Sequence, residues 1–198
     1  MRELKLPLSL EDVKGLMIGE SVKLTGRIFT ARDEAHMRAL EFHKEGKELP
    51  FDLNGSAIFH CGPIMRRSGE KWAVVAAGPT TSFRMSTLEP EVIESFGVRA
   101  IIGKGGMSRL TIDAMERFGC VYLALTGGAA VIAAKGIEDV RGVHWEDLGM
   151  AEAVWELDVS HFGPLTVAID AHGNSLYEKV GEYIDKRLPF IKSKLGID

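Results

Sequence analysis

In the first 80 residues, apolar and polar positions alternate with the period of β-strands. The run Glu20–Phe29 alternates in this way, and the apolar segments Ala57–His60 and Trp72–Ala77 flank a turn-like segment, Arg67–Lys71. Alternation with a period of two is typical of strands that bury one face, and short apolar runs beside turn residues are typical of buried strands. The first part of the chain is therefore predicted to be rich in β-structure.

One helix is expected to interrupt these strands, from Ala31 to about His43. Apolar residues recur within it at helical spacing. Thr30 is predicted to be its N-cap, because a threonine hydroxyl can accept a hydrogen bond from the first helical turn. Asp33 follows three residues later, in the position of a capping box.

From about residue 88 the pattern changes to alternating helices and strands. Helices are predicted over Pro90–Phe96 and Ser108–Phe118, and apolar strands over Val98–Ile102 and Cys120–Leu125. A further helix of small residues is expected over Ala129–Lys135. Such βα units imply parallel strands that are joined by helical crossovers.

The last part of the chain predicts two more strands, Ala153–Val159 and Leu165–Ile169, around a turn at Phe162–Pro164. Asn174 is expected to cap a closing amphipathic helix that ends near Leu188, after which residues 189–198 can fray. No internal repeat, linker or low-complexity segment divides the sequence. The chain is therefore predicted to be a single α/β domain over residues 1–198, with a β-rich first half followed by βα units.

Composition limits the kind of partner that such a domain can have. The chain has 198 residues, of which 45% are hydrophobic and 26% charged, as expected for one domain with a full core. Its formal net charge of -4 argues against bulk attraction to nucleic acid. The N-terminus lacks the apolar run of a secretory signal, and the sequence has no apolar stretch of about 18 residues or more. We expect a cytoplasmic protein that binds small acids or other proteins, and neither nucleic acid nor a membrane.

Cysteines and histidines give no indication of a metal site. Cys61 and Cys120 are the only two cysteines, and neither stands in a CxxC or Cys/His ligand spacing, so we predict no metal ligands on this chain. Cys61 and His60 are expected to be buried core residues, and His36 to have a structural or surface role. The other histidines considered fall near predicted turns without a metal-like partner: His144, His161 and His172.

Three segments that carry candidate chemistry lie where a strand passes into a helix. At such a point the first helical N–H groups lack partners and the helix dipole favours negative charge. The first segment is Thr30–Arg38. A cation in the first helical turn is unfavourable, so an anionic ligand or a partner carboxylate would explain Arg32. A solvated arginine beside a capping box explains the pattern equally well.

The second segment, Gly78–Met85, has the sequence GPTTSFRM. Small residues let a ligand approach the backbone, the hydroxyls of Thr80 and Thr81 can form hydrogen bonds, and Arg84 offers a planar fork that matches a carboxylate. We interpret this segment as a carboxylate site. The alternative is a turn rich in helix-capping residues.

The third segment, Ile101–Ser108, surrounds Lys104 with glycines. Gly103, Gly105 and Gly106 can form a nest of backbone N–H groups around an anion, to which Lys104 adds a positive charge. A glycine turn with an exposed lysine is an equally good explanation. A nucleotide-binding domain is a weaker alternative, because neither the GxxxxGK[ST] nor the complete GxGxxG pattern occurs here.

Together the three segments supply Arg32, Arg84 and Lys104 with hydroxyl groups nearby, which suits a substrate with two carboxylates. The residues alone thus predict a dicarboxylate or phosphate site without an evident strong base, metal or electron sink. A non-catalytic subunit that senses an anion or assists assembly would use the same pocket.

Three runs also resemble, in order and spacing, the signatures of a known family: Gly26–His36, Ala77–Met85 and Ile102–Met107. They are similar to the C-terminal domain of class I fumarases and to the β subunit of two-subunit fumarate hydratases and L-tartrate dehydratases. The resemblance covers nearly the whole chain. It implies a swivelling β/β/α domain that closes over a larger domain or subunit, which carries a [4Fe-4S] cluster on three cysteines.

The resemblance further implies that one iron of this cluster binds the substrate hydroxyl as a Lewis acid. Arg32, Arg84 and Lys104 would hold the carboxylates, and Thr80, with Thr81 beside it, would be the candidate base. The implied activity is the reversible hydration of fumarate to L-malate, with dehydration of L(+)-tartrate as the alternative. Since this chain has no cysteine triad, it would be active only with a cluster-bearing α subunit, in a heteromer such as α2β2.

Overall fold

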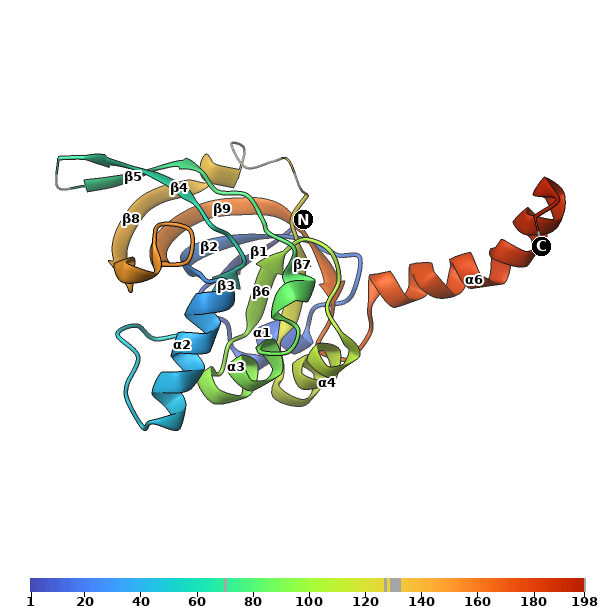
Figure 1. The fold of residues 1–198 in the computed structure, drawn as a ribbon, viewed down its shortest axis with the longest axis horizontal. Coiled ribbons are helices and arrows are strands. Elements are labelled where there is room, and N and C mark those ends of the chain that lie inside the picture. The colour runs from blue at the N-terminus through green and yellow to red at the C-terminus, as the bar shows by residue number, and fades with distance from the viewer. Residues whose placement is uncertain (70, 127, 129–132, 198) are drawn as a thin grey trace.

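The computed structural model describes residues 1–69, 71–126, 128 and 133–197 (Figure 1). Its main sheet has seven strands in the order β1-β2-β3-β6-β7-β9-β8, and a separate hairpin is formed by β4 and β5. The strands of the main sheet are β1 (Arg2–Lys5), β2 (Ser21–Thr30), β3 (Ala57–Phe59), β6 (Ala100–Gly103), β7 (Val121–Ala124), β8 (Ile137–His144) and β9 (Val154–Ile169). The hairpin consists of β4 (Ile64–Ser68) and β5 (Lys71–Ala76).

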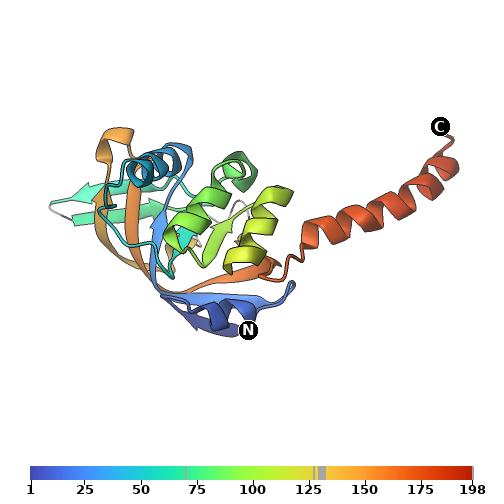
Figure 2. The same cartoon turned by 90° about the horizontal axis from the view of Figure 1, so that it is seen from below.

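Helices cover both faces of the sheet. Figure 2 shows α2, α3 and α4 on one face and the short α1, close to the N-terminus, on the other. The α-helices are α1 (Leu10–Lys14), α2 (Asp33–Lys44), α3 (Glu89–Phe96), α4 (Arg109–Phe118) and α6 (Leu176–Leu195), and the 3-10 helices are η1 (Ser82–Met85) and η2 (Glu146–Leu148). The expected mixed α/β fold is thus confirmed. The helix expected over residues 129–135 falls mostly on positions outside the described ranges.

Strands β2, β3, β6 and β7 run parallel to one another, and the βα pattern had predicted this for β6 and β7. Their carboxyl ends therefore meet at one edge of the sheet. Side chains on these strands alternate between two cores because the period of a strand is two. Phe59, Ile102 and Leu123 belong to the core on the side of α1, whereas Ile101 and Tyr122 belong to the core under α2, α3 and α4. Full burial of each large apolar side chain stabilises the fold by roughly 1.5–3 kcal/mol.

Strand β9 closes the sheet on itself. It pairs antiparallel with β7, with β8 and, over most of its length, with β2. The two separate strands predicted here were wrong, because one strand of 16 residues passes through the expected turn. The strand bends at His161, with a φ of 51°, and at Gly163, with a φ of 149°. A Cβ at Gly163 would lie 2.9 Å from the carbonyl oxygen of Val22, so the glycine permits this close pairing.

The structure also corrects the predicted start of α2. Thr30 is the last residue of β2, and its hydroxyl accepts a hydrogen bond from the N–H of Trp155 at 3.0 Å instead of capping the helix. Arg32 occupies the N-cap position without a side-chain cap, and Asp33 is the first helical residue. The Thr30 hydroxyl thus forms a hydrogen bond within the sheet, whereas the local sequence pattern had predicted that it caps the helix.

Four of the described strands and α-helices were absent from the sequence prediction: β1, α1, β4 and β8. Of these, α1 had a readable signal, because the Ser9 hydroxyl accepts a bond from the Asp12 N–H and the Asp12 carboxylate accepts one from the Ser9 N–H. This is a capping box.

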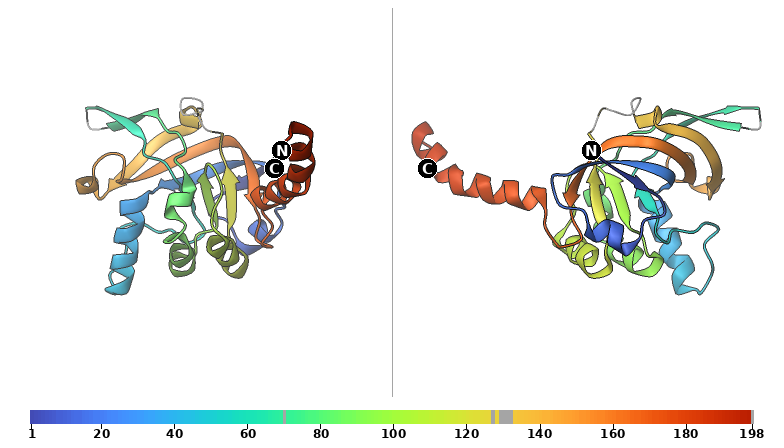
Figure 3. Two further views of the ribbon diagram at one scale, coloured as in Figure 1. Left: turned by 45° about the vertical axis from the view of Figure 1, so that its right-hand side comes forward. Right: turned by 180° about the vertical axis from the view of Figure 1, so that it is seen from behind.

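Helix α6 begins one residue later and ends seven residues later than predicted. Ser175 is its N-cap, whereas Asn174 donates to the carboxylate of Asp170, and the helix continues through Pro189 to Leu195. Figures 1 and 3 show α6 projecting away from the rest of the molecule. Among the described helices, none combines the length and the hydrophobicity needed to cross a membrane.

Candidate functional site

The three candidate segments meet at the carboxyl edge of the parallel strands. Arg32 follows β2, Lys104 follows β6, and the segment from Thr80 crosses above β3. The N–H of Thr80 donates to the carbonyl of His60 at 2.7 Å, and the N–H of Lys104 donates to the carbonyl of Thr80 at 3.3 Å. The N–H of Ser82 in turn donates to the carbonyl of Lys104 at 3.0 Å. The hydroxyl segment and the lysine turn are therefore held together by their backbones.

Both arginines lie at the N-terminus of α2, each beside a carboxylate of this chain. Arg84 Nη2 is 2.6 Å from Asp33 Oδ2, and Arg32 Nη2 is 3.2 Å from Glu152 Oε1. The Arg84 side chain is 52% exposed and that of Arg32 20% exposed. Since a guanidinium has five N–H donors, one carboxylate orients it and leaves other donors for a ligand. The partner carboxylate that the sequence suggested for Arg32 is thus present.

Glu152 shows that this helix end accepts negative charge. Besides contacting Arg32, its carboxylate accepts a hydrogen bond from the Glu34 N–H at 3.2 Å, in the first turn of α2. A Cβ at Gly62 would lie 2.8 Å from Arg32 Nη1, so the glycine makes room for the guanidinium. The N-terminus of α2 and two arginines therefore form a positive edge that fits carboxylates.

Beneath these loops lies a row of five polar side chains, which we term the buried polar chain: Tyr122, Ser82, His60, Glu89 and His36. The Tyr122 hydroxyl donates to Ser82 Oγ at 2.9 Å, and Ser82 Oγ is 2.9 Å from His60 Nδ1. Glu89 Oε2 is 3.0 Å from His60 Nε2 and 3.2 Å from His36 Nε2. The five residues are at most 2% exposed. The buried polar chain connects β3, β7, α2 and α3 to the segment that carries Thr80.

The partners of His36 require both of its ring nitrogens to carry protons. Nδ1 is 2.7 Å from the carbonyl oxygen of Arg32, which can only accept. Nε2 faces the Glu89 carboxylate, where an unprotonated nitrogen would set its lone pair against negative charge. Burial disfavours this imidazolium, but the charge and contact of Glu89 and the Arg32 carbonyl outweigh burial and raise the pKa of His36. His36 is therefore a buried cation that supports the backbone of Arg32.

Glu89 is the matching anion. Burial alone would raise its pKa, but the imidazolium of His36 and the contacts of both histidine rings reverse this effect and lower the pKa to about 2. For His60, burial has the largest influence and lowers the pKa. His60 is accordingly neutral, with Nε2–H toward Glu89 and Nδ1 accepting from Ser82. The ring N–H groups are not ideally aligned with Glu89 Oε2, so the contact with His36 is a charge pair and the contact with His60 joins the Nε2–H dipole to the carboxylate, more than either is a linear hydrogen bond.

The same cluster is the one set of described His, Cys, Asp or Glu residues with metal-ligand spacing. The ligand atoms of His36, His60 and Glu89 lie within 4.8 Å of one another. Glu89 Oε2 lies 3.0 Å from His60 Nε2 and 3.2 Å from His36 Nε2, and the attraction between the carboxylate and the two rings explains the cluster without a metal ion.

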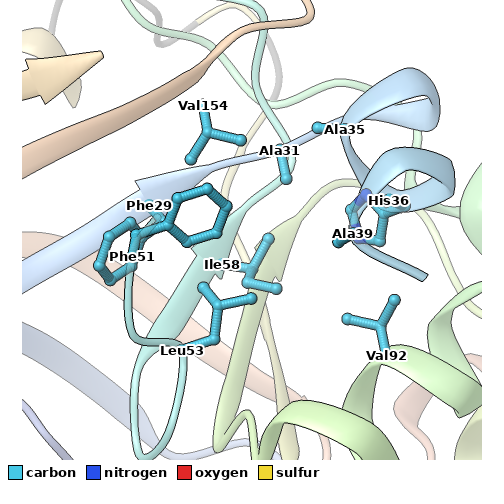
Figure 4. A pocket seen from close by; sticks show the side chains of 10 residues that line it. All are labelled: Phe29, Ala31, Ala35, His36, Ala39, Phe51, Leu53, Ile58, Val92 and Val154. Carbon is cyan, nitrogen blue, oxygen red and sulfur yellow. The ribbon is translucent and has the colours of Figure 1, made fainter. Parts of the chain in front are cut away.

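Behind His36 lies an apolar cavity of about 10 Å³, between α2, α3 and the sheet (Figure 4). A cavity of this size is at the lower limit for one water molecule, which would also need several polar partners. His36 is the only polar residue among those that line it: Phe29, Ala31, Ala35, His36, Ala39, Phe51, Leu53, Ile58, Val92 and Val154. On this side the imidazolium therefore faces hydrocarbon, which increases its dependence on Glu89.

Gly103 is required by close packing. A Cβ there would lie 1.9 Å from Ser82 Oγ and 2.9 Å from the Tyr122 hydroxyl. The absent side chain thus lets the two hydroxyls of the buried polar chain meet under the loops. Gly105, with a φ of 79°, and Gly106 remain predicted parts of an anion nest, while the N–H of Lys104 is already bonded to Thr80.

The expectations for Cys61 and His60 are confirmed, since both side chains are buried, and Cys120 is buried as well. Burial raises the pKa of Cys61 to about 12, so its thiol stays protonated at neutral pH. Cys61 and Cys120 point into the two separate cores on opposite faces of the sheet. They do not fit an iron–sulfur cluster, which requires several cysteine thiolates around one point.

Sequence reasoning missed Ser82 as a buried contact, as well as Glu89, Tyr122 and Glu152. Glu89 precedes Pro90 and looks like an ordinary first-turn acid, and Tyr122 looks like any aromatic residue in an apolar strand. No local pattern marks them, because their partners are distant in sequence. A buried histidine that needs a partner, His60, was the one available signal.

Comparisons with known proteins find one family over most of the chain. The family model described as Fumarase C-terminus matches residues 2–180. A protein named "Putative L(+)-tartrate dehydratase subunit beta", from Methanocaldococcus jannaschii, is 48% identical over 91% of this chain and 93% of its own length. The L(+)-tartrate dehydratase subunit beta of Escherichia coli K12 is 43% identical over 96% of this chain and 93% of its own length. A "Putative fumarate hydratase class I" from Geobacillus stearothermophilus is 41% identical over 89% of this chain, which corresponds to 34% of that protein.

Proposed function

Because the chain belongs to the fumarase C-terminus family, we propose that it is the β subunit of a two-subunit iron–sulfur hydro-lyase that reversibly hydrates fumarate to L-malate. The observation that carries this proposal is the convergence of Arg32, Arg84 and Lys104 with Thr80 at one sheet edge. Two arginines at the N-terminus of α2 and a lysine whose backbone is bonded to Thr80 suit a small molecule with two carboxylates.

The proposed role of the cations is to bind the substrate and to stabilise charge during the reaction. In the dehydration direction, a proton leaves the carbon beside one carboxylate and hydroxide leaves the neighbouring carbon. Negative charge builds on the first carbon and its carboxylate, where Arg84 and Lys104 can stabilise it. Loss of one such donor would cost roughly 3–5 kcal/mol of transition-state stabilisation. Asp33 and Glu152 orient the two guanidinium groups before the substrate arrives.

Thr80 is the proposed base, with Thr81 beside it. A threonine alkoxide is very unfavourable at neutral pH, so the proton can be taken only with help from neighbouring cations and a further acceptor. The backbone of Thr80 is bonded on both sides, to His60 and to Lys104, and this fixes the residue next to a cation. That arrangement supports the assignment of Thr80.

The group that assists departure of hydroxide is proposed to be a [4Fe-4S] cluster on a partner α subunit, where it would act as a Lewis acid. Cys61 and Cys120 are unsuited to hold it, as described above. The names of the two β-subunit relatives support a heteromer. This chain on its own is accordingly proposed to bind a dicarboxylate without turning it over.

Dehydration of L(+)-tartrate is the second candidate reaction. It is favoured by the relatives from M. jannaschii and E. coli, whose names specify tartrate dehydratase. Tartrate differs from malate by one hydroxyl, and the carboxylate-binding residues of this chain suit both acids. We therefore expect that the residues that recognise this hydroxyl belong to the α subunit.

The test is reconstitution. The chain is co-expressed anaerobically with a candidate cluster-bearing subunit, and fumarate absorbance is followed with malate as substrate, then product formation with tartrate. We expect turnover only when both chains are present. Turnover by this chain alone, or undiminished turnover by the partner alone, would refute the proposal. The ratio of kcat/KM for malate and tartrate decides between the two reactions.

A further inference from the structure

Helix α6 is a long element with little to pack on. Its 20 residues span about 30 Å at 1.5 Å per residue, and none of them is buried. Figures 1, 2 and 3 show from several sides that only its first turns approach the rest of the molecule. Most of the stability of helices in proteins comes from packing an amphipathic face, so a projecting helix of this length requires an explanation.

The exposed face of α6 is apolar. Six large side chains recur at intervals of three or four residues and so form one stripe along the helix. We term them the α6 stripe: Tyr177 (39% exposed), Val180 (56%), Ile184 (52%), Leu188 (43%), Ile191 (46%) and Leu195 (66%). The opposite side carries charged residues, among them Lys179, Glu182 and Lys186. A contiguous apolar surface of this kind marks an interaction site.

The α6 stripe begins at the rim of the candidate site. The ring of Tyr177 lies against Gly106, where an added Cβ would be 3.4 Å from the ring. Glu178 Oε2 in the same turn is 3.3 Å from Arg109 Nη1, at the start of α4. Beside Arg84, the phenyl ring of Phe83 is 60% exposed. A subunit that completes the site must sit over these loops, and it would then meet Phe83 and the first turn of α6.

Comparison with the relatives points to the same partner. The family model ends at residue 180, within the second turn of α6. The alignment with the E. coli β subunit covers 190 of the 198 residues, so it includes α6 at least as far as Phe190. In the G. stearothermophilus relative the matching region is only 34% of one longer chain. A separate β subunit must hold its partner without a covalent link, and a long apolar helix supplies such a contact.

We propose that the α6 stripe is the docking surface for the α subunit that completes the active site. The helix would lie in an apolar groove of that subunit, which would bind the stripe side chains at their intervals of three or four residues. Residues 186–197 contain Lys186, Arg187, Lys192 and Lys194 and no acidic residue, so the far end of the groove is expected to be rimmed by carboxylates. This inference rests on the proposed function for the identity of the partner.

The test uses the full-length chain with Ile184→Asp, which places a charge in the middle of the stripe. Binding to the purified α subunit is measured anaerobically, and we expect the complex to be weakened about 100-fold. Lys179→Asp introduces the same residue on the opposite face, outside the basic segment 186–197, and is expected to change the affinity less than about threefold. Circular dichroism of both variants verifies that the helix remains formed.

Activity separates docking from catalysis. With Ile184→Asp, the α-subunit concentration that gives half-maximal turnover should rise about 100-fold, while turnover at saturation stays within about twofold of the wild type. Loss of turnover at saturation, or wild-type affinity of Ile184→Asp, would overturn the proposal. The proposal would also fail if the wild-type chain formed dimers through the stripe, and if Ile184→Asp abolished these dimers without weakening α-subunit binding. If the wild-type complex formed without any hydro-lyase activity, the proposed reaction would fail, yet weaker binding of Ile184→Asp would still support the docking surface.

Discussion

The buried polar chain and the positive edge above it, which consists of the N-terminus of α2 with Arg32 and Arg84, use charge in opposite ways. His36 and Glu89 have side chains that are at most 1% exposed, and their opposite charges neutralise each other. Arg84, whose side chain is 52% exposed, is oriented by one carboxylate and keeps donors directed to solvent. Buried charges must be neutralised inside the fold, whereas exposed charges are available to a ligand. The buried polar chain thus supports the loops from below and leaves their upper side free for substrate and partner.

If this division is correct, the largest loss of folding stability should follow a change in the buried pair. Glu89→Gln removes the anion that holds the buried imidazolium, and we expect the free energy of unfolding to fall by about 3 kcal/mol. Urea denaturation measures this loss. The matched control is Glu91→Gln on the same helix, whose carboxylate is 44% exposed and pairs with Lys44, and it should cost less than about 0.5 kcal/mol. Equal losses in the two variants would contradict the account.

Gly103→Ala is expected to have the next largest effect. The new methyl group would overlap Ser82 Oγ, so the hydroxyl must move and the buried polar chain must rearrange, at a cost of about 1–3 kcal/mol. Gly142→Ala on β8 is the control, because the nearest atom to its Cβ is at 3.6 Å, an ordinary contact. Thermal unfolding compares the two. A Gly103→Ala protein as stable as the control would show that the hydroxyls do not need this space.

The pH dependence of stability should report both charges of the buried pair. The pKa of Glu89 is lowered from 4.5 to about 2, so its contribution is present above pH 4.5 and is lost as the pH falls toward 2. The pKa of His36 is raised above 6.5, so its contribution is complete below pH 6.5 and is lost as the pH rises through the raised value. The lowered pKa of His60 partly offsets this gain below pH 6.5.

The stability difference between wild type and Glu89→Gln should therefore shrink as the pH rises above neutrality, by at most about 1.4 kcal/mol per pH unit for one proton. The other titratable groups that face the pair, Asp33 and Cys120, are common to both proteins. Nitrogen NMR shifts of His36 give a direct check, since both ring nitrogens should be protonated at neutral pH. A neutral His36 at pH 7 would contradict the assignment.

The contrast between the two regions also explains what the sequence could predict. Period-two and helical patterns identified β2, β6, β7 and α4 because each buries one face or is wholly apolar. Strand β8 has no fully buried residue and carries no such pattern. Strand β9 was divided in two because Gly163-Pro164 has the composition of a turn, although here it bends a continuous strand.

In the candidate site, the exposed residues were the ones that the sequence could predict. Arg32 and Lys104 stand close after the parallel strands β2 and β6, whose carboxyl ends meet, and Arg84 lies in η1, beyond the end of β5. The buried half depends on contacts such as Ser82 with Tyr122, which are 40 residues apart. A serine, a glutamate and a tyrosine at these positions have no distinctive spacing. Only the folded chain brings them to His60.

Arg84→Ala should have the smallest effect on stability and a large effect on function, and it tests the proposed site most directly. The variant and the wild type are reconstituted with the α subunit, and kcat/KM is measured on malate and on tartrate. Arg117→Ala, at the far end of α4, is the control. We expect Arg84→Ala to reduce kcat/KM at least about 100-fold on the better substrate, with an unfolding free energy within about 1 kcal/mol of the wild type and an intact complex. A kcat/KM near the wild-type value on both substrates would contradict the assignment of the site.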